Sequence, residues 1–314
     1  MYVLCVNSNG LDYRLILEEC GIYKAQICDV IKNINLLKNK YTDAQLINIY
    51  NHILINIKNY EILTHTVKLL DLYKNDITLS ILLNYLQLEN ETDNDESINF
   101  KIICIKAIAN YKNNSTVTAL LNCMNNKNEH YRIRLACADA LGRIGNKYAV
   151  NSLINVVEDE NEKSLYLKES ATFALGLIGD TSAIDPLISI LESKQGFLDK
   201  FSFLKEKIIE ALGKLNFNNK RVFNALKLSL MDPSPLVRIN AIEAIMNSGE
   251  EESINLIRSS LDDEDNEVKK NALIALYNLI GRDVLDEIIS LPIYSDFLKE
   301  EAQILINEYE ENYE

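Results

Sequence analysis

Small and apolar residues recur at fixed positions in segments centred on an alanine. In each copy, position +1 after the alanine is Ile or Leu, and position −3 is small or apolar. Positions −3, 0, +1 and +4 lie on one stripe of an α-helix, so this stripe is expected to be buried. A basic residue stands six positions before each alanine, in the pairs Lys101/Ala107, Arg134/Ala140, Lys168/Ala174, Lys205/Ala211, Arg238/Ala244 and Lys269/Ala275.

The spacing of these alanines indicates a repeated unit about two helices long. The steps between them are 33, 34, 37, 33 and 31 residues. A repeat of this length is typical of a stacked solenoid. After Ala140 and Ala174 the chain reads Leu-Gly-Arg-Ile-Gly and Leu-Gly-Leu-Ile-Gly, and each run leads into a second apolar segment. A glycine just past the last helical residue can adopt the left-handed conformation, so each unit is predicted to be helix, tight turn, helix.

One of these units carries a family resemblance. Residues 168–191 read Lys-Glu-Ser-Ala-Thr-Phe-Ala-Leu-Gly-Leu-Ile-Gly-Asp-Thr-Ser-Ala-Ile-Asp-Pro-Leu-Ile-Ser-Ile-Leu. This segment resembles a HEAT repeat of the phycobilisome-lyase type. The resemblance is strong around 134–191, good at 234–281 and weaker at 101–126 and 205–230. It implies an all-α fold, a right-handed α-solenoid (superhelix) of stacked antiparallel helix pairs.

The repeats are expected to form one continuous array. The segment 68–84 aligns with 106–122, sharing Tyr-Lys-Asn and Leu-Leu-Asn, so the array begins by about residue 60. Apolar periodicity predicts helices at about 23–38 and 42–57, and a last helix from about Tyr294 after Pro292. The predicted segments are N-terminal helices stacking on the array in 1–60, the HEAT-like array in 61–291, and a C-terminal capping helix in 292–314.

Composition agrees with a single helical array. The chain has 314 residues with only ten Gly and four Pro, and it shows no Pro/Gly/Ser-rich linker. Although 47% of the residues are hydrophobic, no apolar run approaches the ~20 residues that a membrane helix needs. The first residues lack the basic region of a signal peptide. We therefore expect a cytoplasmic location and no membrane partner.

Charge is distributed unevenly along the chain. Residues 1–150 hold 16 Lys and Arg against 15 Asp and Glu, whereas residues 151–314 hold 16 against 31. An acidic second half would repel a phosphate backbone, so no nucleic-acid partner is expected.

Part of this acidity precedes the basic −6 residues. Acidic residues lie in the segments before Lys168, Arg238 and Lys269. HEAT-like families commonly form a ladder of contacts between acidic and basic residues of neighbouring repeats. The resemblance therefore implies a structural inter-repeat ladder of Arg134, Lys168, Arg238 and Lys269, and basic contacts to a ligand are the alternative.

The candidates for catalysis or metal binding are few. Deoxyhypusine hydroxylases use a similar scaffold with His-Glu pairs that ligate two irons, but the −5 and −4 positions here contain no His. The three histidines, His52, His65 and His130, are scattered, and none is followed by Glu. The six cysteines form no Cys-x-x-Cys pair and are expected to be structural thiols. We predict no catalytic residue, no metal ligand and no cofactor.

Two pairs of glutamates keep an acid/base site open as an alternative. Glu169 with Glu206, or Glu210 with Glu243, would place carboxylates on neighbouring Ala-centred helices. Glutamates on a solvated helix face are the commoner arrangement.

The stripe opposite the buried one is the candidate binding surface. It contains positions −4, −1 and +3 of the Ala-centred helices, taken as the second helices of the repeats. In the copy centred on Ala174, these positions include Phe173 and Leu177, one turn apart. The neighbouring copies offer charged residues, namely Asp139, Arg143, Lys207, Glu210 and Lys214. An apolar centre with a charged rim favours protein binding, while a core position for Phe173 is the alternative.

An enlarged connection follows this copy. Residues 193–203 include three of the eight phenylalanines, and insertions in solenoids often carry binding. Phe197, after Gly196, is expected to be partly exposed and to contribute to binding. Internal packing of Phe201 and Phe203 in a lengthened helix is the alternative.

These patterns predict a non-catalytic scaffold or adaptor that binds a protein partner on the face formed by the second helices. The alternative, implied by the resemblance to phycobilin lyases, is the attachment or chaperoning of a prosthetic group on a client protein. Such lyases often act as two-subunit complexes, so a hetero-complex is an arrangement to test. A HEAT-repeat hydroxylase is the third and least favoured function, because its His-Glu pairs are missing.

Overall fold

The computed structural model describes residues 11–88, 94–192, 202–215, 219–248 and 252–311. In this part of the chain there are eighteen α-helices and no strand. None of these helices is both long and apolar enough to cross a membrane. The chain divides into two compact units, residues 1–149 and 150–314, and each is described by itself.

The first unit contains eight of the α-helices. They are α1 (Tyr13–Glu19), α2 (Ile27–Leu36), α3 (Asp43–Asn56), α4 (Tyr60–Leu70), α5 (Asp76–Gln87), α6 (Asp95–Ala109), α7 (Asn114–Asn125) and α8 (Tyr131–Ile144). Two short 3-10 helices, η1 (Leu37–Asn39) and η2 (Lys147–Ala149), also belong to this unit.

The second unit contains the other ten. They are α9 (Val150–Glu158), α10 (Leu165–Ile178), α11 (Ile184–Glu192), α12 (Ser202–Leu215), α13 (Lys220–Ser229), α14 (Pro235–Ser248), α15 (Ser253–Ser259), α16 (Asn266–Ile280), α17 (Asp283–Ser290) and α18 (Asp296–Glu311). The 3-10 helices η3 (Thr181–Ala183) and η5 (Ser260–Asp262) precede α11 and follow α15.

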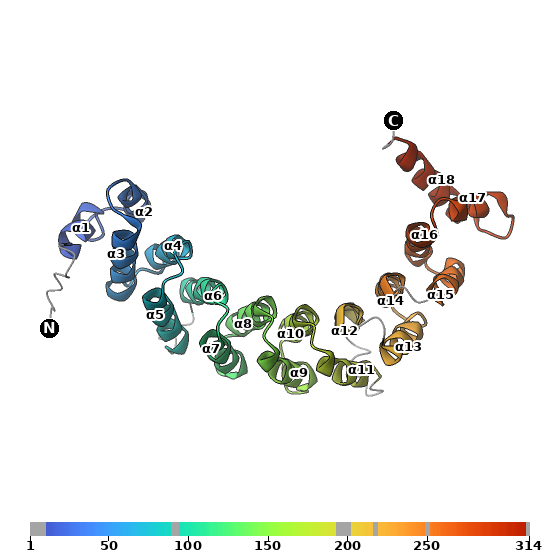
Figure 1. Ribbon diagram of the computed structural model, residues 1–314, viewed down its shortest axis with the longest axis horizontal. Helices are drawn as coiled ribbons and strands as arrows, with labels where there is room; N and C mark the ends of the chain where they lie inside the picture. Colours follow the sequence, from blue (N-terminus) through green and yellow to red (C-terminus); the bar gives the residue numbers. More distant parts are fainter. Residues whose placement is uncertain (1–10, 89–93, 193–201, 216–218, 249–251, 312–314) are drawn as a thin grey trace. The chain divides into compact units, whose positions relative to one another are not determined.

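Within each unit the helices form two layers. In the first unit α4, α6 and α8 pack in succession, as do α3, α5 and α7. In the second unit α10, α12, α14 and α16 form one layer, and α9, α11 and α13 pack side by side in the other. Figure 1 shows the even-numbered and odd-numbered helices of these stacks on opposite sides. The all-α solenoid of stacked helix pairs is therefore confirmed.

Asparagine side chains begin several of the helices. The Oδ1 atoms of Asn59, Asn75, Asn94, Asn113 and Asn219 accept hydrogen bonds from backbone N–H groups in the first turns of α4, α5, α6, α7 and α13. The first N–H groups of a helix have no partner within the helix, so a short side-chain acceptor at the N-cap stabilises this end. The many asparagines of this chain thus have a local structural use.

Left-handed residues end several of the even-numbered helices. Gly145 and Gly179 follow α8 and α10 with φ of 73° and 72°, as the sequence predicts. The turns after α4 and α6 instead place Lys74 (φ 43°) and Lys112 (φ 50°) in the left-handed region. A side chain is strained there, because its Cβ approaches the following carbonyl oxygen.

The predicted buried stripe forms the core of both units. The alanines at position 0, their +1 neighbours and the −3 residues are all buried, among them the fully buried Cys137, Ala140 and Ala174. The helices expected at about 23–38, 42–57 and after Tyr294 are α2, α3 and α18. The division into segments 1–60, 61–291 and 292–314 stays a prediction.

Candidate protein-binding face

The basic −6 residues lie where an odd-numbered helix turns into the next even-numbered one. Lys101, Arg134, Lys168 and Arg238 are buried there, and each donates to a backbone carbonyl at or just beyond the end of the preceding helix. The bonds are Lys101 Nζ to Leu88 O (2.7 Å), Arg134 Nε to Met124 O (2.7 Å), Lys168 Nζ to Val157 O (2.8 Å) and Arg238 Nη1 to Asp232 O (2.8 Å). Carbonyls at a helix C-terminus lack partners and carry negative partial charge, so a cation stabilises this turn.

Carboxylates of the following repeat neutralise several of these cations. Lys101 Nζ lies 2.9 Å from Glu129 Oε2, Lys205 Nζ lies 2.9 Å from Asp232 Oδ2, and Arg238 binds both carboxylate oxygens of Asp263 at 2.8 and 2.7 Å. The sequence points to acids that precede Lys168, Arg238 and Lys269. For Arg238 the structure differs, because Asp232 offers it only a backbone carbonyl and pairs its carboxylate with Lys205.

Lys269, expected in the same ladder, has a different environment. Its side chain is only half-buried, and its Nζ donates to Asn266 Oδ1 at 3.3 Å, in the first turn of its own helix. By contrast, Lys168 is 1% exposed, and burial lowers its pKa against the opposing effect of nearby carboxylates. The same position in the repeat therefore holds a buried cation in one copy and a partly exposed one in another.

The apolar pair on α10 faces solvent. Phe173 is 37% exposed and Leu177 is 43% exposed, so neither is a core residue and the core alternative for Phe173 does not hold. Their neighbours Ala174 and Leu175 are fully buried, which fixes the orientation of α10. The i, i+4 spacing places the two apolar side chains on adjacent turns of one rigid helix.

Ion-paired residues of α12 border this apolar pair. Glu210 lies at the centre, with Lys207 Nζ 2.9 Å from its Oε2 and Lys214 Nζ 2.6 Å from its Oε1. Although burial raises the pKa of Glu210, the hydrogen bonds from Lys214 and Lys207 lower it below its ordinary value. The ammonium of Lys214 also lies 4.8 Å from the centroid of the Phe173 ring, a cation–π contact. We call Phe173, Leu177, Lys207, Glu210 and Lys214 the α10–α12 face.

Gly176 lets the two helices of this face approach closely. A Cβ at this position would lie 3.2 Å from Ala211 Cα and 3.6 Å from Lys214 Cδ. The absence of a side chain therefore allows α12 to pack against α10 and leaves room for the stem of Lys214, which reaches back over Phe173.

Three of the predicted partner-binding residues are not part of this face as the structure describes it. Asp139 and Arg143 lie on α8 of the first unit, where Asp139 is half-buried and Arg143 is exposed. Phe197 lies outside the described residues, as does Phe201, while Phe203 is half-buried at the start of α12. The α10–α12 face is thus defined within the second unit alone, and its binding role stays a prediction.

The structure places the carboxylate of Glu206 in an environment that could not be predicted from the sequence. Its Oε1 atom is buried and has no hydrogen-bond partner among the residues that the structure describes. Burial raises the pKa of Glu206, and the nearby charge of Glu169 raises it further, while Lys207 acts in the opposite direction. The alternative pair, Glu210 with Glu243, is unlike this, because Glu210 is bound by two lysines and Glu243 is exposed. The spacing of residues in the sequence does not indicate which oxygen will be buried without a hydrogen bond. The state of Glu206 Oε1 therefore becomes apparent only from the packing of the helices.

Each histidine has a local role in packing or hydrogen bonding. His52 stacks on Tyr13 with ring centroids 4.5 Å apart, His65 Nε2 lies 3.0 Å from Asn35 Oδ1, and His130 Nδ1 accepts the backbone N–H of Arg132. Burial lowers the pKa values of His52 and His65. Among the described residues, no group of three or more His, Cys, Asp or Glu side chains could hold a metal ion.

Two cysteines that are far apart in the sequence meet in the first unit. The thiols of Cys123 on α7 and Cys137 on α8 are both buried, and burial together with the nearby Cys123 thiol raises the pKa of Cys137 well above its ordinary value. Burial raises the pKa of Cys104 as well. Thiols held in this protonated form are weak nucleophiles and behave as packing residues.

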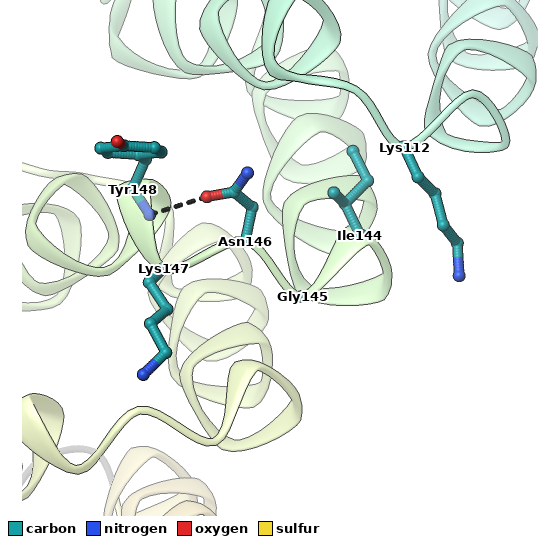
Figure 2. A pocket seen from close by; sticks show the side chains of 6 residues that line it. All are labelled: Lys112, Ile144, Gly145, Asn146, Lys147 and Tyr148. Atoms are coloured by element: carbon teal, nitrogen blue, oxygen red, sulfur yellow. Dashed lines mark hydrogen bonds between the residues drawn. The ribbon is translucent and has the colours of Figure 1, made fainter.

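A shallow depression of about 640 Å³ lies at the turn after α8. Figure 2 shows Lys112 and Lys147 on opposite sides of it, with Ile144 and Asn146 between them. Asn146 Oδ1 accepts the backbone N–H of Tyr148 at 3.0 Å. None of its six lining residues is buried, so this depression lacks the enclosed, convergent polar groups of a small-molecule site.

Comparison with known families agrees with the architecture. The model for HEAT repeats matches residues 85–165 and 199–277, and the model for the PBS lyase HEAT-like repeat matches 167–193. The HEAT matches cover half of the chain, and the chain therefore belongs to the HEAT repeat family. A search among curated proteins finds no match.

The chain is similar to several solved structures at low sequence identity. Kap95p bound to RanGDP is 13% identical with a TM-score of 0.59, and the match covers 96% of this chain and 47% of that chain. The CpcE–CpcF complex of phycocyanin lyase from Nostoc sp. PCC7120 is 20% identical, with 74% and 87% covered and a TM-score of 0.45. Human deoxyhypusine hydroxylase is 14% identical, with 85% and 96% covered and a TM-score of 0.38.

Proposed function

We propose that this protein is a non-catalytic scaffold or adaptor that binds a protein partner on the α10–α12 face. The observation that carries the proposal is the exposure of Phe173 and Leu177 on adjacent turns of a rigid helix, beside a network of paired charges. Large side chains at the centre of an interface supply most of its binding energy, while a polar rim excludes water.

The geometry of the face supports this use in a second way. Phe173 and Leu177 are fixed by the buried residues beside them, and Lys207, Glu210 and Lys214 hold one another in place. A partner that docks there orders few side chains, so little conformational entropy opposes binding. A solenoid of similar fold, Kap95p, binds the folded protein RanGDP.

The test is a paired comparison of two double substitutions. Phe173→Asp with Leu177→Asp places charge at the centre of the face. Leu228→Asp with Met231→Asp makes the same change at two exposed apolar residues at the end of α13, in the same unit. All four positions are exposed, so both variants should keep the wild-type circular dichroism spectrum and melting temperature within about 2–4 °C.

The readout is co-purification from the native cells, with bound proteins identified by mass spectrometry. We expect a specific protein to be lost from the Phe173/Leu177 variant and retained by the Leu228/Met231 variant. Retention by both variants would contradict the proposal. A collapse of the fold in the Phe173/Leu177 variant alone would show that these residues stabilise the unit instead.

A further inference from the structure

The most basic stretch of the chain lies at the end of the first unit. Residues 97–149 hold eight Lys and Arg against two Asp and Glu, whereas the whole chain holds 32 against 46. One of the two acids, Glu129, is bound by Lys101 at 2.9 Å, and both of these side chains are nearly buried. The other, Asp139, is half-buried on α8. The exposed charges of this stretch are therefore mainly positive, on a molecule whose net charge is −14.

Three exposed cations of this stretch lie around the turn after α8. Lys112 and Lys147 line the depression there, and Arg143 lies in the last turn of α8, which leads into it. A hydrogen bond from Asn146 Nδ2 to Asn114 Oδ1, 3.3 Å long, joins this turn to the beginning of α7. Figure 2 shows the side chains of Lys112 and Lys147 on the two sides of the depression, both extending downward in the view. We call Lys112, Arg143 and Lys147 the basic edge.

Two cations of the basic edge are not neutralised by the part of the chain that the structure describes. Within those residues, neither Lys112 nor Arg143 forms an ion pair or a side-chain hydrogen bond. A carboxylate on the neighbouring turn, that of Asp71, accepts hydrogen bonds from Asn110 Nδ2 at 2.8 and 3.0 Å. An anionic group from outside would therefore find exposed cations that are available to bind it.

The backbone of Lys112 also points to a use for its side chain. Its φ of 50° lies in the left-handed region, where a glycine would avoid the close approach of Cβ to the following carbonyl oxygen. Gly145 adopts this conformation after α8. Strained residues of this kind cluster at functional sites. Lys74 has the same conformation after α4, but Asp71 and Asp76 flank it in the sequence.

We propose that the basic edge binds an acidic segment of a partner protein, whose carboxylates contact the three cations and whose apolar side chain enters the depression. Ile144, half-buried, and Tyr148, 77% exposed, give the depression an apolar surface. An open depression of this kind suits one side chain of a peptide rather than a whole small molecule. Exposed ion pairs contribute little one by one, so binding requires several of them together with the apolar contact.

The charge of the whole molecule favours a protein segment over a nucleic acid. Nucleic acids bind through many phosphates along their backbone, and a net charge of −14 repels a long phosphate chain. A short acidic segment needs to approach only the basic edge. This site lies within the first unit, so it does not depend on the α10–α12 face of the second.

The probe is a phage-displayed library of random 12-residue peptides, selected on the full-length immobilised protein at about 50 mM salt, where exposed charges are weakly screened. Binders that also recognise a triple variant, Lys112→Gly with Arg143→Gln and Lys147→Gln, are removed by counter-selection. We expect the remaining peptides to contain severalfold more Asp and Glu than Lys and Arg, together with a large apolar residue. Synthetic copies of these peptides then serve as ligands for titration.

Single substitutions separate recognition from stability. Lys112→Gly, Arg143→Gln and Lys147→Gln should each weaken peptide binding about two- to fivefold, as expected for exposed ion pairs. Lys112→Gly should do so while the melting temperature stays the same or rises, because glycine relieves the left-handed strain. Weaker binding without a loss of stability shows that the Lys112 side chain serves recognition.

Two other lysines of the first unit serve as controls. Lys74→Gly makes the same change at the same left-handed conformation, but beside acidic residues. Lys58→Gln removes an exposed lysine at the turn between α3 and α4. Both variants should keep the wild-type affinity for the selected peptides within about twofold.

Several results would overturn the acidic partner. They are a selection that yields no peptide dependent on the basic edge, dependent peptides without an excess of acidic residues, and tighter binding of a single-stranded RNA than of the selected peptides. Self-association of the wild-type protein that the triple variant lacks would also overturn it, because a second copy would then occupy the edge. The Phe173→Asp/Leu177→Asp protein should bind the same peptides with wild-type affinity, so either site can fail without the other.

Discussion

The Ala-centred helices of the second unit have two edges with opposite properties. At the buried edge, Lys168 and Arg238 lie inside the fold, and their donors bind carbonyl and carboxylate groups of the same unit. At the exposed edge, Phe173 and Leu177 face solvent. The first edge has its polar groups matched within the chain, whereas the second leaves apolar side chains exposed to solvent.

This difference separates what holds the repeats together from what one repeat can bind. The basic −6 residue occurs in all six copies, so it is part of the architecture. An apolar pair at −1 and +3 occurs only in the copy centred on Ala174, so it belongs to that copy and not to the repeat. In a solenoid each helix pair contacts only its neighbours, which lets one copy change its exposed face without altering the stack.

The largest expected effect is at the buried edge. Arg238→Ala would leave the nearly buried carboxylate of Asp263 without its partner and the carbonyl of Asp232 without its donor. Removing one partner of a buried pair costs about 3–5 kcal/mol, so the free energy of unfolding should fall by that amount. Urea titration followed by circular dichroism measures it.

Lys269→Ala is the matched control for this prediction. The same repeat position is half-exposed there, and its hydrogen bond lies within one helix turn, so the change in stability should stay within about 0.5 kcal/mol. Equal losses in the free energy of unfolding for Arg238→Ala and Lys269→Ala would contradict the distinction between buried and exposed copies of the basic −6 residue.

The next largest effect is expected at Gly176, where α10 packs against α12 and the stem of Lys214 passes close by. Gly176→Leu would force a side chain against the backbone of Ala211 and displace the stem of Lys214. Overpacking of this kind costs about 1–3 kcal/mol, and the displacement of Lys214 would also weaken binding at the α10–α12 face.

Gly179→Ala serves as the comparison for Gly176→Leu. It meets no neighbour within 4 Å but has a φ of 72°, so the cost should be about 1 kcal/mol of backbone strain with no change in binding. A Gly176→Leu protein with unaltered stability and unaltered co-purification of the partner protein would show that the helices separate freely.

The smallest effect concerns Glu206 on α12 and depends on pH. The pKa of Glu206 is raised, so the folded protein holds this proton more tightly than the unfolded chain. Its contribution to stability is complete below the ordinary carboxyl pKa of 4.5 and is lost as the pH rises through the raised pKa. At pH 7, Glu206→Gln should therefore slightly increase the free energy of unfolding.

Melting curves of the two proteins between pH 4 and 7 test this dependence. The advantage of the Glu206→Gln protein should shrink as the pH falls toward 4.5. An advantage that is independent of pH, or a loss of stability at pH 7, would mean that the carboxylate of Glu206 is already satisfied in the free protein.

The sequence predicted the positions of the helices and the orientation of the Ala-centred ones. Their register follows from periodicity, which is a local property, so the burial of Ala174 could be predicted, whereas periodicity left both exposure and a core position open for Phe173. The carboxylate partner of Arg238 could not be predicted, because the choice between Asp232 and Asp263 depends on which carboxylate the stacked helices bring close to the guanidinium group.

Two further features could not be predicted from the sequence for a similar reason. The thiols of Cys123 and Cys137 meet because α7 and α8 pack as a hairpin, although no short spacing links them. Lys74 and Lys112 adopt the left-handed conformation at turns where a glycine would be expected. In each case neighbouring helices impose a contact or conformation that the residue's own segment does not favour.

Site-specific photo-cross-linking in the native cells tests the binding face most directly. A photoreactive phenylalanine analogue is placed at Leu177 on α10 or, as the control, at Leu228 on α13, which is more exposed than Leu177. The account predicts a discrete adduct with one partner protein from position 177 and none from position 228. The same adduct from both positions, or no adduct from position 177, would contradict it.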